Sequence, residues 1–343
     1  MDKAIFFTDV GKAEYSDISK YSVNIPSISE QEKHGVVMKL DHAPRSPKED
    51  EIQIEVLASG ICTHEVSIYS GVLTVPEFPM IPGHESVGRV ISTGSNVSGL
   101  NKGDFVSCCW YMGQWSKVIT GPAALAYKIN ADITDPALWI IEPAASIVNA
   151  VSHMEILPGF EVLVIGAGYM GLLMTDLLSH YPLKNLTVFD LKEFNRKRAL
   201  LSGADEVYDP CSAQVGSMRE DPAGHQYDLV VECSGSQSAL DDAIRFCKAS
   251  GQVAIFAWHR SERVIDLKTT HLKGTRIINT SPAIDVEREY SRYWPITISL
   301  FEKGVFNHKH LITHRYKAKN ITEAMTSSSN RCEGFIKSVL EFD

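Results

Sequence analysis

Several features that mark common classes of protein are scarce or missing in this sequence. Its seven cysteines among 343 residues are too few and too scattered for a disulfide framework, and their odd number favours a reducing compartment. The longest apolar run, Val162–Leu178, is broken by three glycines and an aspartate, which excludes a membrane span there. The first residues have no long apolar stretch before a cleavage site. We therefore expect no signal peptide and a cytoplasmic protein.

Positive charge is also scarce. The sequence has 33 Lys and Arg against 42 Asp and Glu, for a formal net charge of -9, and it has no extended basic run. Such a chain is a poor candidate for binding phosphates of nucleic acids or anionic lipids, so we expect neither partner. With 44% hydrophobic and 22% charged residues, the composition is that of a folded globular chain, and its length favours two domains.

The first part of the chain has the pattern of a β-rich domain. Residues 51–58 alternate polar and apolar side chains over their first half, which predicts a half-buried strand. Further short strands are expected at 86–93 and 104–106, separated by turns rich in Gly and Asn, and this predicts a partly open barrel or sandwich. The polar residues 19–50, which contain three prolines, are expected to form an extended surface excursion.

The pattern changes near residue 155, where short apolar strands begin to alternate with helices. This alternation predicts βαβ units around a parallel sheet. The expected strands are 161–165, 186–190, 227–232, 252–257 and 275–279, and the expected helices are 169–180, 193–201 and 237–248. After residue 290 we expect a helix at 293–303 and a final strand at 336–342.

The first of these strands runs directly into a glycine-rich turn. Residues 161–171 read EVLVIGAGYMG, so that Gly166, Gly168 and Gly171 form G-x-G-x-x-G between a strand and a helix. In this context the first glycine permits a tight turn, the second lets a pyrophosphate approach, and the third lets helix and strand pack closely. We expect a dinucleotide on this turn, which also includes Ala167, Tyr169 and Met170.

The next strand ends at Asp190, 19 residues beyond the last of these glycines. A carboxylate there accepts hydrogen bonds from the adenosine ribose and repels a 2′-phosphate, which favours NAD over NADP. Arg196 and Lys197 follow closely and could soften that preference. Ser234 and Gly235 end another strand of the parallel sheet and are further candidates for contact with the cofactor.

Residues with metal-binding side chains occur in the β-rich part. Cys62 lies in GICTHE, His84 and Glu85 in IPGHESVG, and Glu142 in IIEPAAS. Thiolate, imidazole and carboxylate make up the ligand set of a mononuclear zinc site, and a catalytic site leaves one position open. Each residue alone is a weak signal, since an isolated Cys or His is more often structural.

Together with the glycine-rich turn, these motifs resemble the medium-chain dehydrogenase/reductase superfamily of zinc-dependent alcohol and polyol dehydrogenases. The matching stretches are GICTHE, IPGHESVGRV, GDFVS, the pair Glu142–Pro143, VLVIGAGYMGLL, SGADEV, DLVVECSG and LITHRY. The resemblance implies an α/β fold. A GroES-like catalytic domain would comprise residues 1–152 and 290–343, and a Rossmann NAD-binding domain with a doubly wound parallel sheet would comprise residues 153–289.

The same resemblance implies a catalytic zinc held by Cys62 and His84, with carboxylate help from Glu85 or Glu142. Which carboxylate binds directly stays open. A glutamate in the Glu142 position is similar to sorbitol- and threonine-dehydrogenase-like members, whereas classical alcohol dehydrogenases place a second cysteine there. The implied reaction moves a hydride between NAD and a secondary alcohol, polyol or sugar-like substrate. By resemblance alone, we expect a homo-oligomer.

The chain departs from the family pattern in three places. The closely spaced cysteines of the structural-zinc lobe are missing, so we expect one zinc per subunit. The usual proton-relay Ser or Thr is replaced by His64, preceded by Thr63, and His64 either carries the proton or packs beside the metal. Glu65 replaces the usual Asp in orienting a ligand.

Three functional hypotheses therefore stand beside one another. The first is the zinc- and NAD-dependent alcohol or polyol dehydrogenase. The second is a zinc-free enone or quinone reductase on the same fold, which would normally lack Cys62 and His84 together. The third is a dinucleotide-binding protein without turnover. Trp110, Tyr111 and Trp115 either line a substrate cleft or fill the surface that the missing lobe vacates.

Overall fold

The computed structural model describes residues 3–20, 45–75, 78–110, 112–280 and 290–342. Most of the expected surface excursion and Tyr111 lie outside the described residues. The chain forms two compact units. The first comprises Met1–Pro143, Trp294–Glu302 and Ile312–Asp343, and the second comprises Ala144–Tyr293 and Lys303–Leu311. The domain ranges expected from the sequence, 1–152, 153–289 and 290–343, put the points where the chain passes from one domain to the other at different residues. These ranges remain predictions.

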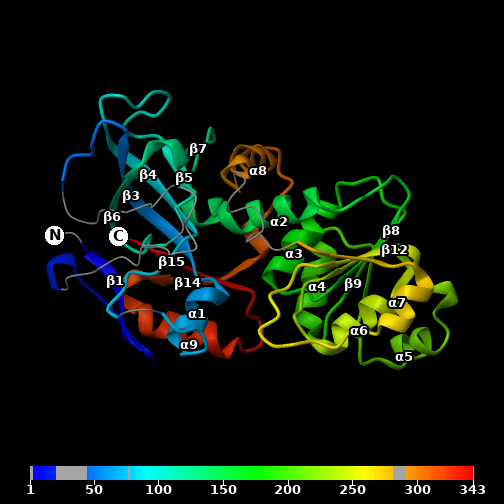
Figure 1. Ribbon diagram of the computed structural model, residues 1–343. Coiled ribbons are helices and arrows are strands. Elements are labelled where there is room, and N and C mark those ends of the chain that lie inside the picture. Colours follow the sequence, from blue (N-terminus) through cyan, green and yellow to red (C-terminus); the bar gives the residue numbers. More distant parts are fainter. Residues whose placement is uncertain (1–2, 21–44, 76–77, 111, 281–289, 343) are drawn as a thin grey trace. The chain divides into compact units, whose positions relative to one another are not determined.

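The first unit is built on a seven-stranded sheet with strand order β14-β15-β3-β4-β5-β7, in which β6 also pairs with β3 (Figure 1). Strand β3 (Glu51–Gly60) alternates buried and partly buried residues, as its sequence predicts. The other strands of this sheet are β4 (Ser86–Thr93), β5 (Phe105–Cys108), β6 (Val118–Pro122), β7 (Ala126–Lys128), β14 (Ile312–Lys317) and β15 (Lys337–Glu341).

Both ends of the chain contribute to this unit. A hairpin of β1 (Lys3–Asp9) and β2 (Lys12–Asp17) comes from the N-terminal end. Strand β15, from the C-terminal end, pairs antiparallel with β3, with Val339 opposite Gly60. The helices of the unit are α1 (Thr63–Tyr69), α8 (Tyr293–Glu302), of which all but Tyr293 belongs here, and α9 (Ile321–Asn330).

Two tryptophans from the stretch of the missing lobe lie in the core of this unit. Trp110 and Trp115 are 1% and 0% exposed. The Trp115 indole N–H donates to Ser59 Oγ at 3.0 Å, and its ring meets Phe7 edge-on. These two side chains therefore fill the core of the first unit.

The second unit contains a six-stranded parallel sheet with strand order β10-β9-β8-β11-β12-β13. Its strands are β8 (Glu161–Ile165), β9 (Asn185–Phe189), β10 (Glu206–Tyr208), β11 (Tyr227–Glu232), β12 (Cys247–Ile255) and β13 (Arg276–Asn279). Its helices are α3 (Tyr169–Leu178), α4 (Glu193–Leu201), α5 (Ala213–Glu220), α6 (Gln237–Phe246) and α7 (Leu267–Lys273), and α2 (Glu142–Ser152) begins in the first unit and continues into this one.

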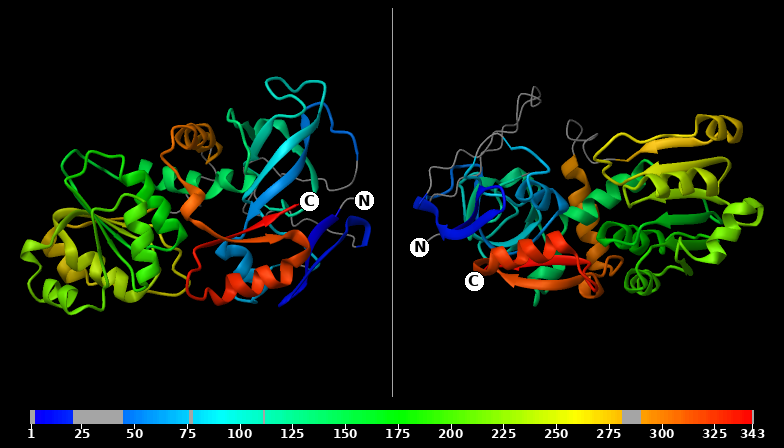
Figure 2. Two further views of the ribbon diagram at one scale, coloured as in Figure 1. Left: turned by 180° about the vertical axis from the view of Figure 1, so that it is seen from behind. Right: turned by 90° about the horizontal axis from the view of Figure 1, so that it is seen from below.

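Strand order reverses between β8 and β11, so the crossover helices cover both faces of the sheet (Figure 2). The carboxyl ends of β8 and β11 flank this switch point, where open parallel sheets bind their ligands. The sheet therefore presents the glycine-rich turn after β8 at the place expected for a dinucleotide. Among the described residues, no helix has the length and apolar character needed to cross a membrane.

Candidate functional site

Cys62 is held by the backbone where β3 turns into α1. It is the N-cap residue of α1, and its N–H donates to Oε2 of Glu65 at 3.1 Å. Glu65 stands at the third helical position, the place from which a glutamate side chain reaches back to the N-cap. The spacing C-x-x-E thus fixes the start of the helix and the position of the thiol.

The same carboxylate orients a histidine from a distant part of the chain. Oε1 of Glu65 lies 2.6 Å from Nδ1 of His84, in the loop before β4. Glu65 is fully buried and His84 is 13% exposed at its side chain. Because Nδ1 is occupied by Glu65, Nε2 is the nitrogen of His84 that remains for a metal ion or for Cys62.

Glu85 forms a buried ion pair with a residue that the sequence analysis missed. Its Oε2 lies 2.6 Å from Nζ of Lys337 on β15, and the two side chains are 2% and 5% exposed. Gly60 leaves room for this pair, because a Cβ there would lie 1.8 Å from Oε2 of Glu85. A lysine in the mostly apolar stretch FIKSVL was the available signal for a buried cation.

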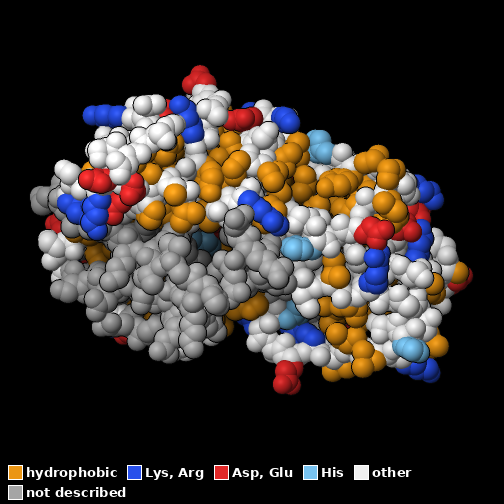
Figure 3. Space-filling model, turned by 45° about the horizontal axis from the view of Figure 1, so that its top comes forward, with side chains coloured by type: hydrophobic (Ala, Val, Ile, Leu, Met, Phe, Trp, Pro, Cys, Tyr) orange, Lys and Arg blue, Asp and Glu red, His pale blue; other side chains and the backbone are white. Residues whose placement is uncertain are grey.

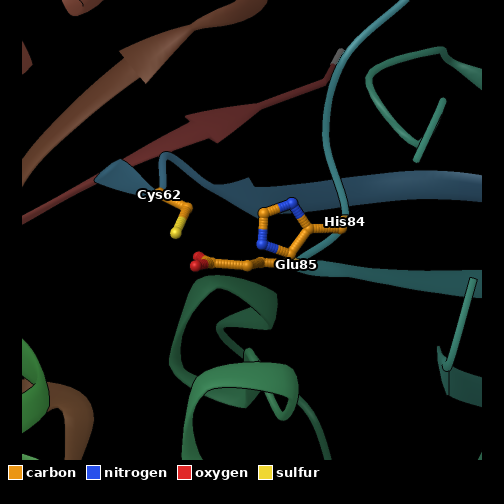
Figure 4. A group of neighbouring side chains, drawn as sticks. All are labelled: Cys62, His84 and Glu85. Atoms are coloured by element: carbon orange, nitrogen blue, oxygen red, sulfur yellow. The ribbon is translucent and has the colours of Figure 1, made fainter. Parts of the chain in front are cut away.

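The three side chains converge in space (Figure 4). One ligand atom each from Cys62, His84 and Glu85 lies within 4.8 Å of the others. Ligand bonds of about 2.0–2.3 Å in a tetrahedral zinc site separate two ligand atoms by roughly 3.5 Å, so small side-chain adjustments would suffice. The donor set therefore fits a zinc ion, and Glu65 supplies the second hydrogen bond that metal-binding histidines use.

The charges and the burial of this cluster favour a bound cation. Burial raises the pKa of the Cys62 thiol, and the carboxylates of Glu85 and Glu65 add to this against a hydrogen bond with His84. Burial opposes the charged form of His84, but Glu65 and the hydrogen bonds from Cys62 and Glu65 outweigh it and hold its pKa well above the usual value. A bound dication reverses both preferences, because metal ligands must lose their protons.

His64 and Thr63 lie beside this cluster. The His64 ring stands edge-on to the His84 ring, with centroids 5.9 Å apart, and a nitrogen of His64 lies within 4.8 Å of ligand atoms of Glu65 and His84. Burial lowers the pKa of His64, against the field of Glu65. Thr63 Oγ1 accepts a hydrogen bond from the guanidinium of Arg331, the residue after α9.

Glu142 is not part of the convergent group among the described residues. It begins α2, and its charge, together with burial, raises the pKa of Cys109 to about 12, with burial the larger cause. Burial also raises the pKa of neighbouring Cys108 well above its usual value. In the described part of the chain, the two groups of potential metal ligands share His84, so they mark one place.

The glycine-rich turn has the geometry that its three glycines predict. Gly166 has φ +100°, a conformation that other residues rarely adopt. A Cβ on Gly171 would lie 1.8 Å from the carbonyl oxygen of Gly166, whereas a Cβ on Gly168 would meet nothing within 4 Å. The first glycine is thus required by its backbone conformation and the third by packing. The second leaves open space at the N-cap of α3.

The other expected cofactor residues surround this turn. Asp190 Oδ2 accepts the Ala167 N–H at 2.7 Å, and its Oδ1 accepts the Lys192 N–H at 2.8 Å. Arg196 donates to the carbonyl oxygens of Asp190 and Leu191 at 2.7 and 2.9 Å, so it supports this loop.

The side chains around the start of α3 differ in burial and in their contacts. Tyr169 is 8% exposed, and its hydroxyl lies 3.0 Å from Nε2 of His308, in the part of the C-terminal segment that belongs to this unit. Its side chain is therefore structural, and its backbone N–H is the group available at the helix start. Met170 is partly buried. Ser234 packs against Gly166, since a Cβ on that glycine would lie 3.0 Å from the Ser234 Cβ.

Comparison with known proteins agrees with these observations. Residues 48–131 match the family model of the alcohol dehydrogenase GroES-like domain, and residues 170–295 match that of the zinc-binding dehydrogenases. D-arabinitol dehydrogenase 1 of Uromyces fabae is 24% identical over an alignment of 314 residues that covers 82% of this chain and 88% of that protein. An L-threonine 3-dehydrogenase of Shewanella oneidensis is 24% identical over an alignment of 326 residues that covers 86% of this chain and 93% of that protein.

Solved structures share the whole fold. An alcohol dehydrogenase of Escherichia coli CFT073, crystallised with NADH, has a TM-score of 0.81 at 20% identity, and 99% of both chains align. A zinc-binding dehydrogenase of Sinorhizobium meliloti bound to NADP has a TM-score of 0.80 at 20% identity, again over 99% of both chains.

The two matched models cover more than half of the chain and define its class, a dehydrogenase with a GroES-like domain and a Rossmann-like domain. The chain belongs to the medium-chain dehydrogenase/reductase superfamily, and its relatives are zinc-type alcohol dehydrogenases. The fold class and the family resemblance predicted from the sequence are confirmed.

Proposed function

We propose that this protein is a zinc- and NAD-dependent dehydrogenase of a secondary alcohol, polyol or sugar-like substrate. The observation that carries the proposal is the convergence of Cys62, His84 and Glu85 within 4.8 Å, with Glu65 holding the outer nitrogen of His84. Cys62 comes from the turn before α1, whereas His84 and Glu85 come from the loop before β4, and gathering these buried and partly buried polar side chains has a cost that a bound metal ion would offset.

Each residue has a defined role in this proposal. Bound zinc supplies Lewis acidity, which lowers the pKa of a coordinated alcohol or polarises a carbonyl. Cys62 and His84 hold the ion, and Glu65 orients His84. Glu85, rather than Glu142, is the nearby carboxylate, and it is shared with Lys337. His64 would take the substrate proton, with Thr63 beside it, and a dinucleotide bound at the glycine-rich turn would supply the hydride acceptor.

The metal content tests this proposal against the zinc-free reductase. We expect about one zinc per chain in the purified protein, measured by plasma mass spectrometry, because the described residues offer one ligand set. A content near two would reveal a second site. A metal-free protein that reduces enones or quinones with full activity would favour the alternative, and a zinc-loaded protein without turnover would favour the non-catalytic hypothesis.

The cofactor preference rests on Asp190. Asp190 directly follows β9, and its carboxylate, which lies beside the glycine-rich turn, would repel a 2′-phosphate. Structural relatives with NADH and with NADP are both known, so the fold alone does not decide.

We expect Asp190→Asn to raise the ratio of NADP to NAD turnover about tenfold, since one repulsive charge at close range is worth about 1.4 kcal/mol or more. Initial rates with both cofactors check this, and Asp209→Asn, next to the same loop, is the control. A wild-type enzyme already faster with NADP would contradict this assignment.

Two observations favour a polyol as the substrate. A relative that acts on D-arabinitol and the glutamate at position 142 favour polyols. A panel of polyols, amino alcohols and cyclitols, followed by NADH absorbance, would identify the substrate. Figure 3 shows acidic and basic side chains mixed on the described part of one face, which suits a small-molecule substrate better than a nucleic acid.

We also propose a homo-oligomer that uses the edge strand β13. Strand β13 closes the sheet of the second unit on one side. Val264, Leu267 and Leu272, in and before the adjoining α7, are 76%, 71% and 74% exposed. In the described part of the chain β13 has no partner strand on its outer side, and such an edge beside exposed apolar side chains favours association between copies.

Light scattering of the purified protein should give at least twice the chain mass of 38.0 kDa, and Leu272→Glu should lower it. A wild-type protein of monomer mass would exclude this interface. We also propose a cytoplasmic location, on the ground that the sequence has only seven scattered cysteines, an odd number.

A further inference from the structure

A buried carboxylate organises the turn that follows β11. Glu232 is 0% exposed. Its Oε1 accepts three hydrogen bonds, from Ser234 N at 2.7 Å, Ser234 Oγ at 2.7 Å and Gly235 N at 2.8 Å. This oxygen therefore holds the main chain of residues 233–235 in one conformation, and Gly235 has φ +77° there.

The other oxygen of Glu232 reaches the loop after β12. Oε2 lies 2.9 Å from Nε2 of His259, and Nδ1 of His259 accepts the Nε–H of Arg263 at 3.0 Å. The same guanidinium donates through Nη2 to the Gly235 carbonyl at 2.7 Å. The four residues thus close a ring of hydrogen bonds that joins two loops of the sheet.

This ring fixes the tautomer of the histidine. A guanidinium only donates hydrogen bonds, and an ionised carboxylate only accepts them. Nδ1 must therefore be unprotonated toward Arg263, and Nε2 must carry the hydrogen that Glu232 accepts. His259 has no freedom to exchange these roles while both partners are present.

The main chain of residues 233–235, which this ring holds, packs against the glycine-rich turn after β8. A Cβ on Gly166 would lie 3.0 Å from Ser234 Cβ and N, and a Cβ on Gly171 would lie 3.5 Å from Cys233 Cβ. On the other side, a Cβ on Gly235 would lie 3.3 Å from the Trp258 carbonyl oxygen. Residues 233–235 are therefore packed between the turn after β8 and the end of β12, where a dinucleotide would cross the sheet.

We propose that Glu232, His259 and Arg263 are positioning residues for the dinucleotide, and that the fixed tautomer of His259 keeps the turn at residues 233–235 in its binding conformation. This inference rests on the proposed function, in that it takes the glycine-rich turn as the cofactor site. None of the three needs to touch the cofactor. They act through the backbone of Ser234 and Gly235.

A double-mutant cycle tests the tautomer directly. Glu232→Gln keeps an oxygen for Ser234 and Gly235 but turns an N–H₂ toward His259. His259 must then accept at Nε2 and protonate Nδ1, which faces the Arg263 Nε–H. Arg263→Met removes the Nε–H donor. In the double variant, a His259 protonated at Nδ1 therefore no longer faces a second donor. We expect NADH binding, measured by fluorescence titration, to weaken at least tenfold in Glu232→Gln, about threefold in Arg263→Met, and less than tenfold in the double variant.

Two further variants separate positioning from stability. His259→Leu removes both the donor and the acceptor, and we expect at least tenfold weaker NADH binding. His259→Gln restores one donor and one acceptor side by side, and we expect it to recover most of that loss. Glu262→Gln, the same chemical change at an exposed residue of the same loop, is the matched control and should bind NADH like the wild type.

The outcomes distinguish this inference from the proposed function. If the wild-type protein fails to bind NADH or NADPH, the proposed function fails. If it binds, and the single and double variants bind equally well or weaken additively, the positioning role is overturned. Nitrogen-15 spectra of the histidines add a readout independent of binding. A His259 protonated at Nδ1 in the wild type would also overturn the inference.

Discussion

Cys62→Ser is expected to lower turnover at least 1,000-fold while NADH binding stays within about twofold of the wild type. The hydroxyl of serine is a far weaker zinc ligand than a thiolate, and this change removes one of two ligands that no other residue can replace. The glycine-rich turn belongs to the other compact unit and keeps its own contacts. Steady-state rates, zinc content and NADH fluorescence on the same preparation measure the three consequences.

The matched control for this variant is Cys332→Ser. Cys332 is an exposed free cysteine outside the convergent group and should tolerate the same exchange with unchanged rates and zinc content. Retained activity in Cys62→Ser, with zinc still bound, would remove this thiol from the metal site. Retained activity without zinc would favour the zinc-free reductase.

Lys337→Met is expected to lower the free energy of unfolding of the metal-free protein by about 3–5 kcal/mol, because removal of one partner leaves a buried charge uncompensated. The partner is Glu85, at 2.6 Å and 2% exposed. If Glu85 lies close enough to share a bound cation, zinc compensates for the missing ammonium, and the loss in the zinc-loaded protein is smaller. Urea unfolding with and without a chelator measures both values.

Two variants calibrate this result. Lys317→Met removes a lysine that pairs with Glu341 at 3.2 Å on the exposed face of the sheet, where ion pairs contribute about 0–1 kcal/mol. Glu85→Gln combined with Lys337→Met removes both charges and should recover part of the stability. If zinc does not reduce the loss of unfolding free energy in Lys337→Met, Glu85 does not interact with the metal ion.

The sequence predicted those parts of the fold and site that follow from local patterns. The alternation in β3 and the apolar β8, followed by three glycines, each have a local physical cause, and the structure has both strands where they were expected. The spacing of Glu65 from Cys62 also follows a local rule of helix starts.

The boundary between α6 and β12 could not be predicted in the same way. The expected helix 237–248 ends at Phe246, and β12 already begins at Cys247, five residues before the expected strand. Ser250 has φ +60°, a conformation that propensity does not predict and that lets the strand bend. This segment is a strand because it pairs in parallel with β11 and β13, and such long-range pairing does not follow from the local sequence.

Long-range pairs were the main part of the site that the sequence did not reveal. Lys337 meets Glu85 only because β15 pairs with β3, and His259 meets Glu232 only because β12 lies beside β11. A residue type and a spacing carry no information on such contacts. The family resemblance supplied Cys62 and His84 but left the choice between Glu85 and Glu142 open.

The way β15 completes the sheet of the first unit has a consequence for synthesis of the protein. Strand β15 comprises Lys337–Glu341 and is translated long after its partner β3, which comprises Glu51–Gly60. The second unit has most of its residues in one continuous stretch and can start to fold while translation proceeds. Glu85 receives its ammonium partner only after β15 has been translated and has paired with β3, so the nascent polypeptide carries an unmatched acidic group until then.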